Sequence, residues 1–110
     1  MSQPGRQAEL YLNDRLVGIV EVRSSDNSWH FGVFTPNADF TRFAPLFGRW
    51  SLLMHADEDA DRLTSAASQE LRETEIEIDR LRAKMRMLAS GEWCELQQIN
   101  IDGDLIDWKT

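Results

Sequence analysis

The segment from residue 57 to residue 90 constrains the fold most, because its apolar residues and its charges are both sorted along the chain. The apolar residues return at alternating steps of four and three, which is the spacing of a helix seam. The seam positions are Ala67, Leu71, Thr74, Ile78, Leu81, Met85 and Leu88. Ser90-Gly91 is a typical helix stop. The pattern therefore predicts one long amphipathic helix over residues 60–89.

The charges of this segment change sign at Arg80. Within the segment, nine acids and two bases precede that residue, whereas the stretch that begins with Arg80 itself and runs to Ser90 holds four bases and no acid. Acids near the start and bases near the end complement the helix dipole. The same order would let two copies lie antiparallel, with the acidic half of each helix against the basic half of the other.

A second apolar face is expected on this helix. Ile76, Ala83 and Met87 fall almost opposite the seam, and a helix that is apolar on two opposite sides has to be covered twice. A sheet can cover one side. Either the helical segment 38–56 of the same chain or a partner chain can cover the other side, and the sequence leaves both alternatives open.

The partner alternative predicts a set of interface residues. Apolar side chains of the second face would touch the other chain, with charged neighbours approaching its opposite charges. Near the chain end, one tryptophan is expected to stay partly exposed. The predicted interface residues are Ile76, Ala83, Met87, Glu73, Glu77, Arg80, Lys84 and Trp108.

Strand patterns occupy both ends of the chain. Residues 7–35 predict a three-stranded meander with turns at Asn13-Asp14 and residues 24–27, and residues 93–109 predict a hairpin around Asp102-Gly103. Residues 37–56 predict a short helical segment capped by Asn37 or Asp39, although residues 50–56 fit helix and strand equally. The fold class expected for this single 1–110 domain is α+β, a five-stranded antiparallel sheet (β-β-β-α-α-β-β) with helices on one face.

Charge and composition exclude several classes of function. The net charge of −7 and the pI near 4.7 argue against binding to nucleic acid or to an anionic membrane surface. No apolar run has the roughly 20 residues needed to span a bilayer, and residues 1–7 lack the apolar core of a signal peptide. Cys94 is the only cysteine, which fits a reducing cytoplasm.

Two groups of acids suggest metal sites, and both have a simpler explanation. The cluster from His55 to Asp61 begins like a calcium loop, but Arg62 replaces the required glycine and Ser68 the closing glutamate. These acids suit a solvated helix start. Asn100, Asp102, Asp104 and Asp107 in the C-terminal hairpin suit a turn and a charged sheet edge. We therefore expect no metal site.

The sequence contains no recognisable catalytic motif. His30 and His55 are far apart and have no partner motif, no glycine-rich phosphate loop or serine nucleophile elbow occurs, and Cys94 fits a small buried residue. We expect no catalytic residue and no cofactor.

An aromatic strand that ends in proline leads into a helix start at residues 29–47. The strand reads WHFGVFTP (29–36), and Phe40 and the APLF of residues 44–47 follow it. Together with the hairpin around INIDGD (99–104), this pattern resembles one seen in small uncharacterised bacterial proteins. The resemblance implies a compact bacterial α+β domain, and it implies no activity, ligand or site residue.

These observations favour a cytoplasmic, non-enzymatic protein-interaction domain, with an antiparallel homodimer through the 60–89 helix as one form. A variant is an acidic protein that neutralises a basic partner. The alternative of another class is a small-ligand binder or enzyme, with a pocket near His30, His55 and the acids of residues 57–61.

Overall fold

The computed structural model describes residues 6–59 and 65–110, and the side chains of residues 6–55 and 67–110. Strands dominate this part of the chain, and two helices lie between the third and fourth strands. The elements in order are β1 (Gln7–Leu12), β2 (Arg15–Asp26), β3 (Trp29–Pro36), the 3₁₀ helix η2 (Ala38–Arg42), α1 (Ala44–Asp59), α2 (Ser65–Asp79), β4 (Lys84–Met87), β5 (Trp93–Glu95), β6 (Gln98–Asp102) and β7 (Leu105–Lys109).

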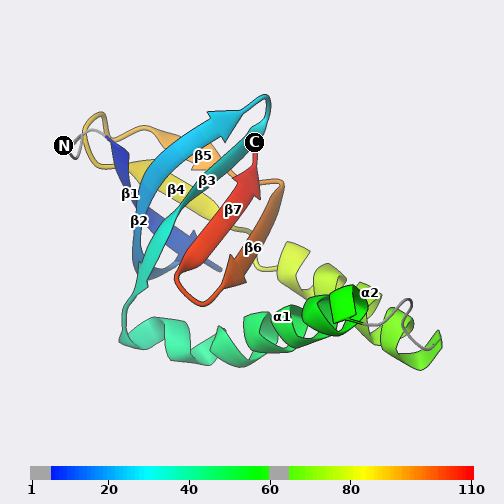
Figure 1. Ribbon diagram of the computed structural model, residues 1–110. Coiled ribbons are helices and arrows are strands. Elements are labelled where there is room, and N and C mark those ends of the chain that lie inside the picture. The colour runs from blue at the N-terminus through cyan, green and yellow to red at the C-terminus, as the bar shows by residue number, and fades with distance from the viewer. Residues whose placement is uncertain (1–5, 60–64) are drawn as a thin grey trace.

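The seven strands form one antiparallel sheet in the order β5-β4-β1-β2-β3-β7-β6. Strands β5 and β6 lie at opposite edges, yet only Leu96 and Gln97 connect them. Leu96 N–H donates to the carbonyl of Ala83 (3.0 Å), and Gln97 N–H donates to that of Lys109 (2.8 Å). A link this short is possible only because the sheet curls until its edges approach one another. The result is the half-barrel seen in Figure 1.

The hydrophobic core fills the concave side of this half-barrel. Alternate residues of the strands point inward, as the two-residue period of a strand requires. The core side chains are Ala8, Leu10, Leu12, Val17, Val20, Phe34, Met85, Ile99, Ile101, Ile106 and Trp108 from strands, Ala83 and Leu81 from the connection before β4, and Ile78 and Phe47 from the helices. The convex side of β3, β7 and β6 is consequently left to other contacts.

Both helices lie at one end of the half-barrel, where α1 passes beneath the β6–β7 turn and α2 runs back toward the sheet (Figure 1). The side chain of Asn37 caps η2 by accepting hydrogen bonds from the N–H groups of Asp39 and Phe40. Pro45 is the second residue of α1, where its missing N–H costs no hydrogen bond. Residues 50–56, which fitted helix and strand equally, belong to α1.

The expected fold class was wrong. The sheet has seven strands rather than five, and the helices close one end of a curled sheet rather than forming a layer on one face. The three-stranded meander of residues 7–35 and the turn at Asp102-Gly103 were correct, but the second turn of the meander lies at residues 27–28 because β2 extends to Asp26. The predicted strand over residues 93–101 is divided, because β5 pairs with β4 while β6 pairs with β7.

The long helix over residues 60–89 was also wrong, because α2 ends at Asp79 and β4 begins at Lys84. Residues 81–87 satisfy two periods at once. Their apolar side chains fit the helical seam, but they also alternate strictly with bases, as the sequence LRAKMRM shows. In the structure the alternation prevails: Leu81, Ala83 and Met85 are buried, and Arg82 takes a left-handed φ of 51° that ends the helical path.

In the part of the chain that the structure describes, no helix combines the length and the apolar character needed to cross a membrane.

Candidate functional site

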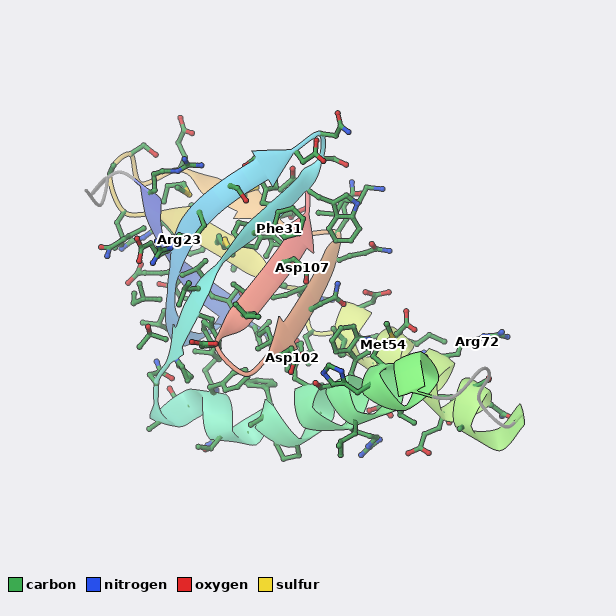
Figure 2. The ribbon with its side chains drawn as sticks, viewed as in Figure 1. Arg23, Phe31, Met54, Arg72, Asp102 and Asp107 are labelled. Carbon is green, nitrogen blue, oxygen red and sulfur yellow. The ribbon has the colours of Figure 1, made fainter. Side chains whose placement is uncertain are left out.

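A cleft of about 340 Å³ lies between α1 and the convex side of β3, β7 and β6. We call it the α1–β7 cleft. Its volume falls within the range of small-ligand sites, and apolar side chains provide most of its surface. The lining residues are Phe31, Gly32, Trp50, Ser51, Met54, His55, Asn100, Asp102, Leu105, Ile106 and Asp107. Figure 2 shows Phe31 and Asp107 on the neighbouring strands β3 and β7, with Asp102 and Met54 lower down toward α1.

Regular spacing places the lining residues on one side of each element. On α1, Trp50 and Met54 are four residues apart, as are Ser51 and His55, so all four lie on neighbouring parts of the helix surface. On β7, Leu105 and Asp107 alternate with the core residues Ile106 and Trp108 and therefore face outward. The cleft is thus built from a helix face and the convex sheet face, at the end where the helices meet the sheet.

Asp102 joins the two walls. Ser51 Oγ donates a hydrogen bond to Oδ1 of Asp102 (2.7 Å), and His55 Nε2 lies 3.0 Å from Oδ2. The hydrogen bond from Ser51, followed by that from His55, holds the pKa of Asp102 below its ordinary value. These contacts fix α1 against the β6–β7 turn and keep the Asp102 carboxylate ionised at the rim of the cleft.

The pKa of Asp107 is shifted in the opposite direction from that of Asp102. Its half-buried side chain lies in the cleft beside Asn100, its neighbour across the β6–β7 pair. Burial raises the pKa of Asp107, and the hydrogen bond from the Asn100 amide only partly offsets that effect. Two carboxyl groups of one cleft are therefore shifted in opposite directions by their surroundings.

A smaller hollow of about 230 Å³ continues the cleft toward α2 and shares Trp50, Met54 and Asn100 with it. This hollow adds the carboxylates of Glu75 and Asp79. Neither the cleft nor the hollow is lined by a lysine or an arginine among the described residues. The combined lining includes apolar and aromatic side chains and four carboxyl groups.

The Ser51–Asp102–His55 cluster does not have the arrangement of a catalytic triad. In a triad the histidine lies between serine and aspartate and accepts the proton of the serine. Here the aspartate lies in the middle, and the Ser51 hydroxyl donates to a carboxylate instead of a base positioned for catalysis. The described residues also contain no group of three or more His, Cys, Asp or Glu side chains able to hold a metal ion.

The structure does not bring the predicted interface residues together. Glu73, Ile76 and Glu77 are exposed on α2, and Arg80 follows its end. Ala83 is buried before β4, Met87 packs against the core from β4, and Lys84 on β4 binds Asp14 (2.7 Å). Glu73, Ile76 and Glu77 still lie on α2, but the other predicted residues do not join them on a helix face because the helix ends at Asp79.

Trp108 was expected to be partly exposed, and that expectation was wrong. It points into the core from β7, a strand flanked by β3 and β6 rather than an edge strand. His30 stacks on Trp108 with ring centroids 5.6 Å apart and bonds to the hydroxyls of Ser25 and Thr110.

The predicted pocket near both histidines is realised only in part. His55 lines the α1–β7 cleft, whereas His30 is not among its lining residues. The side chains of the 57–61 acids lie outside the described residues. Sequence reasoning missed Phe31, Trp50, Met54 and Leu105 as site residues, although the four-residue spacing of Trp50 and Met54 was an available signal.

Comparison with known protein families, with characterised proteins and with solved structures gives no significant match for this chain.

Proposed function

We propose that this protein is a non-enzymatic interaction domain that binds a mainly apolar group of its partner in the α1–β7 cleft. The observation that carries this proposal is the cleft itself: about 340 Å³ of mainly apolar surface with a few oriented polar groups. Ser51 and His55 hold the carboxylate of Asp102 in place before any partner arrives. Preorganised groups of this kind lower the entropic cost of binding.

Binding is favoured over catalysis by the exposure of the titratable groups. The side chains of His55 and Asp102 are 56% and 48% exposed, so solvent screens their charges. Strong electrostatic catalysis depends on groups aimed at a reacting atom in a site that excludes water. An open cleft with a serine that donates to a carboxylate suits recognition better than turnover.

The partner surface proposed from the helix seam has lost its basis, because Ala83 and Met87 are not helical. Lys84, one of the two bases expected to reach a second copy, also binds Asp14 within the chain. We place the domain in a reducing cytoplasm, which the single Cys94 supports, and the charge of −7 supports a partner other than nucleic acid.

The test is an NMR titration of the amide signals with benzyl alcohol as a neutral apolar probe. We expect the amides of Ser51, His55 and Asp107 to shift together. Phe31→Ala should weaken binding by about tenfold, since it removes one aromatic wall. Leu88→Ala is the matched control, because Phe31 and Leu88 are 41% and 43% exposed and Leu88 does not line the cleft.

The proposal is wrong if neutral and charged probes all leave the cleft amides unchanged, or if Leu88→Ala weakens binding as much as Phe31→Ala. Light scattering on the same samples reports whether a second copy of the chain is bound. A dimer that persists in Phe31→Ala would place self-association elsewhere on the molecule.

A further inference from the structure

We propose that the group held in the α1–β7 cleft is the guanidinium of an arginine side chain on a protein partner. This inference rests on the proposed function and adds the chemistry of the occupant. Four features support it: the charge of the lining, the aromatic side chains in the cleft, the local surroundings of Asp107 and the apolar surface around the opening.

Apart from His55, which contacts Asp102, the ionisable side chains of the lining are all acidic. Asp102 and Asp107 line the cleft, and Glu75 and Asp79 line the hollow that continues it. Lysine and arginine are absent from both linings among the described residues, and the whole chain has a net charge of −7. A surface of this sign attracts a cation during encounter and disfavours an anion.

The aromatic side chains favour a planar cation. Trp50 and Phe31 line the cleft together with the two carboxylates. A guanidinium stacks on aromatic rings and donates paired hydrogen bonds to a carboxylate, whereas an ammonium is a compact and strongly hydrated point charge. The three methylenes of an arginine side chain can pack against Met54 and Leu105 while the charge reaches Asp107. The cleft thus offers a contact for each part of an arginine side chain.

A bound cation would stabilise the ionised form of the Asp107 carboxyl group. Within the chain its side-chain partner is the neutral amide of Asn100, and burial disfavours its ionised form. Carboxylates elsewhere on the sheet are supplied with a cation by the chain itself, as Glu9 is by Arg86 and Asp14 by Lys84. A guanidinium at Asp107 would provide the opposite charge that the cleft lacks.

The surface around the opening is larger than a free amine would use. Leu105 is mostly exposed, and on the other side of the Ser51–Asp102 bond lies a second, mainly apolar hollow of about 690 Å³ whose lining includes the exposed Leu52 and one base, Arg49. Apolar side chains next to the arginine of a partner can use this hollow, which a small amine cannot reach. The structure therefore favours a protein as the source of the cation.

The experiment compares short capped peptides with a central arginine or a central citrulline between two leucines. Citrulline has nearly the same shape as arginine but no charge. We expect the arginine peptide to shift the cleft amides of the full chain and to bind about ten- to hundredfold more tightly than the citrulline peptide. Raising the salt concentration from about 0.05 M to about 0.5 M should reduce the difference.

Asp107→Asn should abolish the preference for arginine, while Asp104→Asn should retain it. Asp104 is exposed in the same hairpin and does not line the cleft, so it controls for the loss of one negative charge. Benzylammonium separates the two sources of a cation: tight binding of this amine without binding of the arginine peptide would overturn the assignment to a protein.

Equal affinities for the arginine and citrulline peptides would overturn the inference and leave the cleft as a neutral binding site. If benzyl alcohol and every peptide left the cleft amides unchanged, the proposed function itself would fail. Retained arginine preference in Asp107→Asn would also overturn the role given to this carboxylate.

Discussion

The two edges of the half-barrel differ in whether their acidic side chains are paired with bases of the same chain. On the convex side of β1, β4 and β5, bases and acids alternate between neighbouring strands, with Lys84 bound to Asp14 and Arg86 bound to Glu9. Trp93 adds contacts with both bases, 4.9 Å from Lys84 Nζ and 6.0 Å from the Arg86 guanidinium carbon. Two acid–base pairs of this edge are thus formed within the chain.

The convex side of β3, β7 and β6 is organised in another way. Its carboxylates line an aromatic cleft, and the donors that contact them there are Ser51, His55 and Asn100; Lys109, on the same face of β7, does not line the cleft. A surface that satisfies its own charges gains little from a charged partner, whereas a surface with an excess of one sign gains from an opposite charge. The cleft edge therefore carries the excess of negative charge on which the proposed binding depends, whereas the opposite edge pairs its acids with its own bases.

The largest expected effect separates two tryptophans, one buried in the core and one on the surface. Trp108 lies beneath the cleft hairpin at 4% exposure, and Trp93 lies on the opposite edge at 53%. Trp108→Ala should lower the free energy of unfolding by about 3–5 kcal/mol, since it leaves a cavity in the core. Trp93→Ala should cost about 1 kcal/mol or less, because only surface contacts are lost. Chemical denaturation measures both, and equal losses would contradict the orientation of β7.

The next largest effect concerns the turn that connects α2 to β4. Arg82, two residues before the start of β4, has a left-handed φ of 51°, a conformation that glycine adopts without strain. Arg82→Gly should therefore raise the free energy of unfolding by about 0.5–1 kcal/mol. In a helix continuing to residue 89 the same change would lower it by about the same amount. The sign of the change in thermal denaturation decides between the two; Arg80→Gly is a control that flanks the same turn without a left-handed φ.

Residues 80–87 also show why part of the fold could not be predicted. Their apolar residues fit a helical seam and a strand alternation equally well, and local spacing cannot decide between them. Pairing of Met85 with Leu10 and of Met87 with Ala8 favours the strand. These partners are more than 70 residues away in sequence, so their effect is invisible in the local pattern. By contrast, Asn13-Asp14 fixed the first hairpin locally, since both residues accept a left-handed φ.

The candidate site also combines local patterns, which the sequence shows, with long-range contacts, which it does not. The spacing of Trp50 with Met54 on α1 and the alternation of Leu105 with Asp107 on β7 are local and could be read from the sequence. Their meeting depends on contacts such as Ser51 with Asp102, across 51 residues, and on the curl of the sheet. The sequence therefore contained the faces of the cleft but not the fact that they oppose each other.

The third expected effect concerns the ion pair between Glu9 and Arg86 on the edge formed by β1, β4 and β5. The guanidinium of Arg86 donates to Glu9 Oε1 from Nε (2.9 Å) and from Nη2 (2.8 Å), and the Glu9 side chain is mostly buried. A double-mutant cycle with Glu9→Gln and Arg86→Gln should give a coupling energy of about 0.5–1 kcal/mol that decreases at high salt. The more exposed Asp14–Lys84 pair should couple more weakly. A coupling near zero for Glu9 and Arg86 would remove the contrast between the two edges.

The smallest expected effect on stability concerns the half-buried carboxyl group of the cleft. Burial raises the pKa of Asp107 above its ordinary value of 3.8, so its favourable contribution is complete below that pH and is lost as the pH rises through the folded-state pKa. Asp107→Asn should therefore raise the free energy of unfolding near neutral pH and leave it nearly unchanged at about pH 3. The other titratable side chains of the cleft are His55 and Asp102, and Lys109 follows on the same face of β7. Asp104→Asn serves as the control in the same hairpin.

Asp102→Asn should have the opposite effect and lower the free energy of unfolding near neutral pH, because the pKa of Asp102 is depressed by Ser51 and His55. If both cleft variants changed stability in the same direction, the two carboxyl groups would not differ as the structure indicates.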